Sequence, residues 1–444
     1  LATLIFYAAS FWFPSSRTNI SNTNPPLSFP AATLLPADGA ATESSIRFFS
    51  ERVKRDPEDY SAQNKLAACY LQRVRETSSE DFLPLALQAA RASLDSVPAE
   101  RNFSGLIILA RAEFANHGFA KARDHALQLV KLAPEKGESY ATLGDTLLEL
   151  GDYENAAAAF QQMEQLSPGT VETETRLARL ALLRGQTQKA QQHFRHALLV
   201  LLDFTNPPRE TVAWCRWQLG EVAFSIGDYK NAERQYRDAL ITFPGYFHAL
   251  AAMGKLSAAR GDLREAMAKY REAIQAARAP DFVAALGDLH KVAGQEKEAA
   301  KFYAFVEELG KHSMQVHGTL QNRQLALFHA DHDMQLEQAY ASAASEYAVR
   351  KDIYGADALA WTAFKSGRLS EAKAAMKEAL RLGTRDAKLF YHAGMIARAS
   401  GEKTIGSNYL KRALALNPQF DLRQAPLAQK ALKTDGFLAN VLHK

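Results

Sequence analysis

Residues 143–160 read "LGDTLLELGDYENAAAAF", a helical pattern that a glycine and an aspartate interrupt in the middle. Related stretches follow at 219–236 ("LGEVAFSIGDYKNAERQY"), 253–270 ("MGKLSAARGDLREAMAKY"), 286–303 ("LGDLHKVAGQEKEAAKFY") and 393–410 ("AGMIARASGEKTIGSNYL"). Repetition at a fixed period is typical of arrays in which each short unit stacks on the next. The sequence therefore predicts a repeat protein.

The glycine in the middle of each copy measures the period of the repeat. It recurs with gaps of 34, 42, 34, 33, 73 and 34 residues at Gly151, Gly185, Gly227, Gly261, Gly294, Gly367 and Gly401. We interpret the gap of 42 as one repeat with an insertion and the gap of 73 as two repeats. Each unit is expected to be a pair of antiparallel helices, in which Gly-Asp forms a left-handed cap and turn. No stretch has the alternating pattern of a strand, so the predicted fold class is all-α.

The residue types at fixed positions of the best copies indicate a family. At 137–170 a large residue, Leu, Gly, a small residue, an aromatic residue, an Ala-type residue and Pro recur in order as Tyr140, Leu143, Gly144, Ala156, Phe160, Met163 and Pro168. The copy at 213–246 has the same order from Leu219 to Pro244. This arrangement resembles the tetratricopeptide repeat over residues 45–420. The resemblance implies a right-handed superhelical solenoid whose concave groove is lined by the first helix of each hairpin.

Packing explains the small and aromatic positions independently of the family name. Gly144 and Ala156 are expected to let the two helices of a hairpin approach closely, and Phe160 to fill the gap to the next hairpin. One hairpin cannot bury its apolar face alone, so the hairpins must stack.

The pattern divides the chain into seven parts. We expect an apolar segment at 1–13, an extended tether at 14–44, divergent repeats at 45–134, regular repeats at 135–312, a degenerate repeat at 313–352, further repeats at 353–420, and a closing helix with a tail at 421–444. The degenerate repeat is predicted to be a bent or irregular hairpin.

The N-terminal segment "LATLIFYAASFWF" carries no charge. Its 13 residues are fewer than the about 20 that span a bilayer. Three interpretations stay open: the end of a membrane anchor or signal segment, a segment in the bilayer interface, or an apolar tail that docks on protein. In each, contact is expected through the large side chains Leu4, Ile5, Phe6, Tyr7, Phe11, Trp12 and Phe13. The tether beyond it contains a glycosylation acceptor pattern at Asn19, and the same pattern occurs at Asn102.

Charge and motifs argue against nucleic-acid binding and catalysis. The 53 basic and 49 acidic residues nearly balance, and no basic run is interleaved with aromatic residues. No nucleophile elbow, phosphate loop or haem-attachment motif occurs, so neither enzymatic activity nor a cofactor is expected. The one alternative is a metal site at the histidine-rich stretch of His312, His317, His329 and His332. A polar turn between helices is the interpretation that the sequence favours for these residues.

Function is therefore expected to come from the surface of the concave groove. The candidate contact positions are those of the first helices that packing does not use: Asn64, Thr142, Asp145, Glu149, Arg179, Gln218, Glu221, Lys255, Asp288 and Lys291. Their charges are mixed, so they indicate no single class of charged ligand.

Two functional hypotheses follow. The first is a non-catalytic scaffold outside the cytoplasm, in the envelope or secreted, held by its N-terminal segment and binding a protein partner. The second is a filament subunit, in which the N-terminal tail of one copy docks on the repeats of the next, because a head-to-tail contact does not close on itself.

Overall fold

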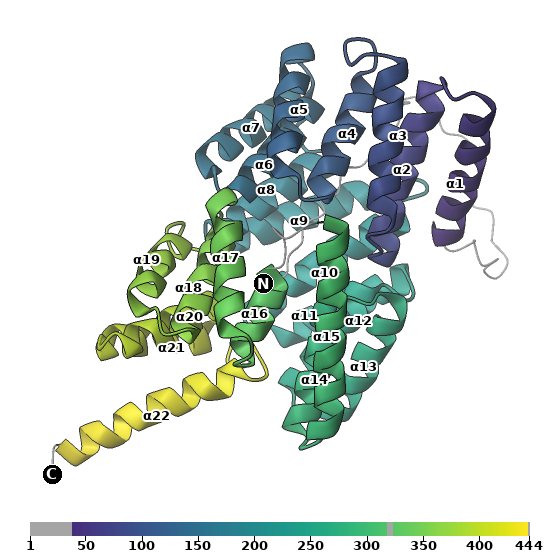
Figure 1. The fold of residues 1–444 in the computed structure, drawn as a ribbon. Helices are drawn as coiled ribbons and strands as arrows, with labels where there is room; N and C mark the ends of the chain where they lie inside the picture. Colours follow the sequence, from purple (N-terminus) through teal and green to yellow (C-terminus); the bar gives the residue numbers. More distant parts are fainter. Residues whose placement is uncertain (1–37, 318–322, 443–444) are drawn as a thin grey trace.

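Helices make up all of the regular structure in the described part of the chain. The computed structural model describes residues 38–317 and 323–442 (Figure 1). The helices are α1 (Asp38–Arg55), α2 (Tyr60–Thr77), α3 (Phe82–Ser96), α4 (Phe103–Ala115), α5 (Phe119–Leu132), α6 (Gly137–Leu150), α7 (Tyr153–Leu166), α8 (Val171–Leu183), α9 (Thr187–Leu202), α10 (Arg209–Ser225) and α11 (Tyr229–Thr242). They continue as α12 (Phe247–Ala259), α13 (Leu263–Ala276), α14 (Pro280–Val292), α15 (Glu296–His317), α16 (Arg323–Asp331), α17 (Leu336–Val349), α18 (Ile353–Lys365), α19 (Leu369–Ala379), α20 (Ala387–Ala399), α21 (Lys403–Leu416) and α22 (Gln424–Leu442).

These helices form ten consecutive hairpins within the described residues, from α2–α3 to α20–α21, with α1 and α22 at the two ends. The predicted all-α solenoid of stacked hairpins is confirmed. Helix α1 begins at Asp38, earlier than the expected Ser45, and Thr42 ties it to α2 by donating a hydrogen bond to Glu76 over 2.7 Å. In the degenerate repeat, α16 has only 9 residues, whereas α15 before it has 22.

The repeated glycine forms the turn inside each regular hairpin. All seven glycines that measure the period have a positive φ, between +69° and +85°. At Gly151, for example, φ is +83° and its N–H donates to the end of α6, while Asp152 accepts a hydrogen bond from Asn155 N–H to start α7. A side chain at such a φ would be strained, which explains why glycine recurs.

The second glycine of each copy lets an aromatic ring lie against a helix backbone. A Cβ at Gly144 would come within 2.2 Å of the ring of Phe160, and the same relation joins Gly220 to Tyr236 at 2.4 Å. Phe160 is fully buried, at 1% exposure. The ring therefore packs on the first helix of its own hairpin, and its core cluster also includes Leu180 and Leu183 of the next hairpin.

Replacing Gly144 with alanine is therefore expected to destabilise the fold. The overlap with Phe160 should lower the free energy of unfolding by about 1–3 kcal/mol. The higher helix propensity of alanine should offset up to about 1 kcal/mol of this loss. Urea denaturation followed by circular dichroism measures the difference. In a Phe160→Leu background the same substitution should cost less, because the ring is gone. Equal losses in both backgrounds would show that ring contact is not the cause.

The array curves until its C-terminal repeats lie beside hairpins from the first half (Figure 1). Three loops of the C-terminal repeats, at 350–353, 381–385 and 416–418, meet the ends of α6, α8 and α10; we call this contact the seam. Lys351 N–H donates to Leu150 O over 3.2 Å, Thr384 Oγ1 to Leu183 O, and Asn417 Nδ2 to Phe224 O over 2.7 Å. The last carbonyls of a helix lack intrahelical donors, and the seam provides a donor to one such carbonyl in each of three successive hairpins, although Phe224 O also accepts from Gly227 N–H.

One apolar side chain crosses the seam and is fully buried there. Ile353 is 0% exposed and packs in a core cluster with Leu148 and Tyr153. Its N–H also donates to Tyr153 Oη over 2.8 Å. Tyr354 and Leu382 of the C-terminal repeats are partly buried against the same cluster, and Ile353 is its fully buried member from that side of the seam.

Candidate functional site

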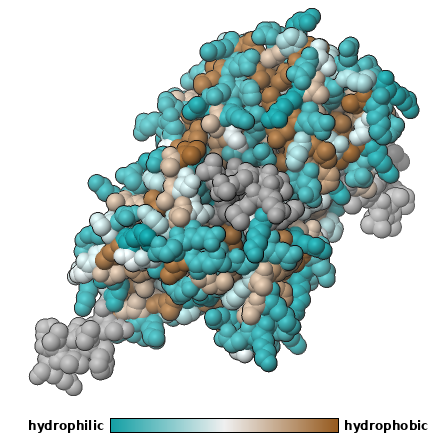
Figure 2. All heavy atoms as spheres, in the orientation of Figure 1, coloured by the Kyte–Doolittle hydropathy of each residue, from teal (hydrophilic) through white to brown (hydrophobic). Residues whose placement is uncertain are grey.

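A large cavity lies inside the curve of the array, and we call it the central cavity. It has a volume of about 870 Å³ and is lined by residues from α2 to α20 and from the loop after α21. Figure 2 shows that the outer face seen there is mostly hydrophilic, with hydrophobic residues in scattered clusters. The central cavity thus brings side chains of many helices together around one internal space.

One wall of the central cavity is aromatic. It is formed by Trp214 and Trp217 of α10, Phe247 of α12 and Phe282 of α14. His248 stacks on Trp217 with 4.4 Å between ring centroids. Burial lowers the pKa of His248 to about 4, so this imidazole is neutral at pH 7 and belongs to the apolar surface.

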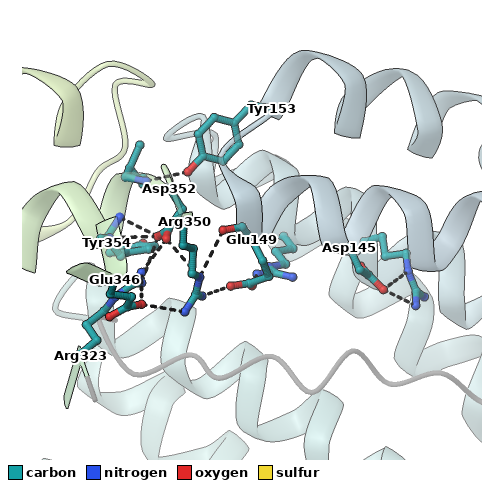
Figure 3. Close-up of polar contacts among 12 residues, drawn as sticks. Asp145, Glu149, Tyr153, Arg323, Glu346, Arg350, Asp352 and Tyr354 are labelled. Atoms are coloured by element: carbon teal, nitrogen blue, oxygen red, sulfur yellow. Dashed lines mark hydrogen bonds and ion pairs between the residues drawn. The ribbon is translucent and has the colours of Figure 1, made fainter. Parts of the chain in front are cut away.

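The wall at the seam carries a network of ion pairs (Figure 3). Arg350 donates to Glu149 of α6, and its guanidinium lies 3.2 Å from both Glu346 and Asp352. Arg323 binds the same two carboxylates, at 2.7 Å from Glu346 and 2.6 Å from Asp352. Such groups stay charged in a buried position only because they are paired.

The environment shifts the pKa values of the two acids at this wall, Glu346 and Asp352, in opposite directions. Burial raises the pKa of Glu346, and Arg323 only partly opposes this. Burial alone would raise the pKa of Asp352 too, but Arg323 and Arg350 lower it below its ordinary value. Elsewhere in the cavity burial raises the pKa of Asp281 to about 6. Asp386, 2% exposed, has one oxygen, Oδ2, with no hydrogen-bond partner in the described part of the chain.

The predicted groove residues lie mostly on the walls of two cavities. Glu149, Arg179, Glu221 and Lys255 line the central cavity. Asn64, Thr142 and Asp145 line a second cavity of about 560 Å³ among α2, α4 and α6, which we call the side cavity. Of the remaining three, Gln218 is buried at 1% exposure, Asp288 is half-buried and Lys291 is exposed.

Many of these side chains form ion pairs with side chains of a neighbouring repeat. Asp145 binds Arg176 at 2.7 Å, Glu149 binds Arg179, and Lys255 binds Glu221 at 2.7 Å. Each pair joins the first helices of two successive hairpins. Besides offering groups to a ligand, these side chains therefore hold the concave face of the array together.

Sequence reasoning overlooked the aromatic residues of the central cavity and the seam arginines. Trp217 and Phe247 lie on first helices, but only polar positions of these helices were selected as candidates. The selection of all first-helix residues, whatever their polarity, would have included them. Arg350 lies between α17 and α18, outside any first helix, and no sequence signal indicated its contact with Glu149.

The described histidines of the histidine-rich stretch each pair with a carboxylate. His329 binds Glu307 at 2.5 Å and His332 binds Asp288 at 2.8 Å. Among the described residues no group of three or more His, Cys, Asp or Glu side chains could hold a metal ion. The side chains of His312 and His317 lie outside the described part. Asn102 is 2% exposed and caps α4, which is incompatible with glycosylation of the folded chain.

The predicted contacts of the N-terminal segment, from Leu4 to Phe13, and the acceptor Asn19 lie outside the described residues. Within residues 38–317 and 323–442, no helix combines the length and the hydropathy that crossing a bilayer requires.

Comparison with solved structures found similar folds of low sequence identity. One is a tetratricopeptide repeat protein from Parabacteroides merdae, with 15% identity, a TM-score of 0.41, and coverage of 56% of this chain and 97% of that chain. Another is PilW, a type IV pilus biogenesis factor, with 16% identity, a TM-score of 0.40, and coverage of 49% and 97%. The Cut9–Hcn1 hetero-tetramer of the APC/C gives 12% identity, a TM-score of 0.37, and coverage of 89% and 94%.

No curated protein matched the sequence. Two family models, both described as the tetratricopeptide repeat, do match. One covers residues 169–240 and the other covers 109–170 and 218–281. The matched residues form the hairpins in which glycine takes the turn and an aromatic ring packs on the first helix. Residues 109–281 therefore consist of tetratricopeptide repeats.

Proposed function

We propose that this protein is a non-catalytic scaffold whose central cavity binds an extended segment of a protein partner. The observation that carries the proposal is the composition of that cavity, which combines an aromatic wall with fixed charges in about 870 Å³. This volume is within the range of ligand pockets, and mixed apolar and polar walls suit a polypeptide better than a purely ionic ligand. Solenoid repeats generally use their concave surfaces in this way.

The seam favours an extended segment over a folded domain. Because the C-terminal loops hold to the ends of α6, α8 and α10, the array surrounds the cavity. A stretch of a few residues fits inside, whereas a folded domain would require the seam to separate. Buried aromatic side chains with polar neighbours are also the usual centres of binding energy at interfaces.

Site-specific photo-crosslinking tests this function. A photoreactive amino acid at Lys255, on the cavity wall, should give an adduct with a partner polypeptide in cells. The matched control is Lys301 of α15, whose side chain is 70% exposed and outside the cavity. Mass spectrometry of the adducts identifies the polypeptide. Equal adducts at both positions, or none at Lys255, would contradict binding in the cavity.

The location of the scaffold is the second part of the proposal and rests on the sequence. Residues 1–13 would hold the protein at a membrane outside the cytoplasm, as in an envelope protein. In the competing function, these residues dock on another copy and build a filament. Deletion of residues 1–35 separates the two: release from the membrane fraction supports the anchor, and conversion of fibres to monomers supports the filament.

A further inference from the structure

Three carboxylates on the lining of the central cavity form no ion pair within the described residues. They are Asp281 in the first turn of α14, Asp386 at the start of α20 and Asp421 just before α22. Other acids of the same lining do form ion pairs with arginine or lysine: Glu149, Glu210, Glu221, Glu346 and Asp352. The three unpaired carboxylates therefore set one part of the cavity apart.

Asp386 is the most buried of the three, with an exposure of 2%. Its Oδ1 accepts hydrogen bonds from the N–H groups of Lys388 and Leu389 over 2.8 and 3.2 Å, which caps α20. Its Oδ2 has no hydrogen-bond partner in the described part of the chain. Buried polar atoms are normally satisfied. This oxygen on the cavity wall is therefore an acceptor that a ligand can use.

Asp421 repeats the position of Asp386 in the next unit of the array. Asp352, Asp386 and Asp421 follow one another at intervals of 34 and 35 residues. Each accepts hydrogen bonds from backbone N–H groups at the start of a helix, α18, α20 and α22 in turn. Arg323 and Arg350 neutralise Asp352, whereas Asp386 and Asp421 form no such pair in the described part. Since α20 and α22 are in contact, these two carboxylates should lie about 8–10 Å apart, the usual distance between packed helices.

Asp281 and Asp421 lie beside the same aromatic cluster. The next residues in the sequence, Phe282 and Leu422, both pack in it together with Tyr270. Burial, and next the charge of Asp281, raise the pKa of Tyr270, and Asp421 acts in the same direction. Burial also raises the pKa of Asp281 to about 6, as expected for a carboxylate that no ion pair stabilises. An apolar surface therefore adjoins two of the unpaired carboxylates.

The lining cations close in sequence to these acids do not neutralise them. Lys388 binds Asp331 at 3.0 Å. Arg278 and Arg385 are exposed and form no ion pair within the described residues. Burial of a charge is unfavourable unless a partner compensates it. The buried part of this wall is therefore suited to a ligand that brings its own positive charge.

We propose that the central cavity binds an extended chain with two cationic groups, one at Asp386 and the other at Asp421 beside Asp281. Lysine or arginine side chains of a polypeptide and the amines of a free polyamine share this chemistry. The cations donate charge-assisted hydrogen bonds to the carboxylates, which are among the stronger hydrogen bonds in proteins. The apolar part of the chain lies on the aromatic cluster, whose rings also attract cations. The inference rests on the proposed function only in assigning the cations to the partner segment, and it adds that this segment is basic.

Calorimetric titration of the full chain with small probes tests the inference. The probes are an acetylated and amidated tetrapeptide with lysine at both ends and alanine between them, for a polypeptide, and spermidine, for a polyamine. Each is compared with a neutral probe, the same peptide with glutamine in place of lysine or a linear diol of similar length. At least one cationic probe should bind ten-fold or more tightly than its neutral counterpart, and the arm that does so identifies the source of the cation. Equal binding of cationic and neutral probes in both arms would overturn the proposal.

Variants locate the binding at the unpaired carboxylates. Asp386→Asn should weaken binding of the cationic probe at least ten-fold without lowering the thermal midpoint of the free protein, because asparagine caps a helix as well as aspartate does. Asp421→Asn is the second variant, with an expected loss of about three-fold. The matched control is Asp262→Asn, since Asp262 caps α13 from an exposed position outside the lining of the cavity.

The two proposals can fail separately. Unchanged binding in both Asp386→Asn and Asp421→Asn would refute the cation site even if the crosslink from Lys255 to a partner were obtained. Binding of spermidine that depends on Asp386 would support the cation site even if no polypeptide were crosslinked.

Discussion

Replacing Ile353 with aspartate is expected to separate the C-terminal repeats from the first half of the array. Ile353 is 0% exposed at the seam, where burial of its side chain contributes about 1.5–3 kcal/mol. An unpaired carboxylate in its place adds several kcal/mol of desolvation. Asp352 beside it is already ionised, which adds repulsion. We expect the seam to open rather than the hairpins to unfold, because each hairpin keeps its own core.

Small-angle scattering and hydrogen exchange measure this opening together. The radius of gyration should increase, and the amides of Lys351 and Ile353, which donate across the seam, should lose protection. The amides inside α10 to α13 should keep their protection from hydrogen exchange. The matched control is Ile405→Asp on α21, where isoleucine is 50% exposed and the change should have little effect. A variant at 353 with unchanged scattering and protected seam amides would show that Ile353 does not hold the seam.

The regular hairpins were predictable from sequence because their turns require glycine. The same turn is made without glycine in the divergent hairpins: Ser78 and His117 have φ values of +56° and +57° after α2 and α4. After α16, Asp333 and Gln335 have φ values of +57° and +43°. These residues tolerate the left-handed region less well than glycine, and they carry no recognisable period. The glycine spacing therefore gave no indication of those repeats, although they too consist of helical hairpins.

For the candidate residues, the sequence could predict only that they share one face of a helix. Helical spacing showed that Asp145 and Glu149 lie on one face of their helix, since they are one turn apart, and the family resemblance implied that this helix lines the concave side. It could not show that Glu149 meets Arg350, because the two are separated by 201 residues. That contact depends on the accumulated rotation between successive hairpins, which no local pattern records. The seam, and with it the enclosure of the central cavity, could be found only in three dimensions.

Replacing Arg323 with methionine is the second change with a large expected effect. Arg323 lies between Glu346 and Asp352, whose side chains are only 8% and 6% exposed. Methionine keeps much of the side-chain volume of arginine. It leaves Glu346 and Asp352 buried, and among the described residues Arg350 is the remaining cation beside both carboxylates. Loss of one partner from a buried ion pair costs about 3–5 kcal/mol. Urea denaturation at pH 7 should show a loss of this size.

The matched control for Arg323→Met is an arginine–carboxylate ion pair at the surface of the protein. Arg368 binds Glu337 at 2.6 Å, but the Glu337 side chain is 74% exposed. Arg368→Met should change the free energy of unfolding by no more than about 1 kcal/mol, since exposed ion pairs contribute little. Similar losses in both variants would indicate that the aliphatic part of arginine, and not the buried charge, is responsible.

The pH dependence of Arg323→Met provides a further check on the same cause. In the native wild-type protein Asp352 has a lowered pKa, so its contribution is present above its unfolded pKa and is lost as the pH falls through its folded pKa. Glu346 has a raised pKa, so its contribution is present below its unfolded pKa and is lost as the pH rises through its folded pKa. Without Arg323 both carboxylates should take up protons at a higher pH than before, which removes the unpaired charge. The difference in free energy of unfolding between wild type and variant should therefore shrink between pH 7 and about pH 4.5. Adding Glu346→Met should restore part of the stability at pH 7, because it removes one of the two uncompensated charges; a further loss instead would mean that Glu346 stabilises the seam independently of Arg323.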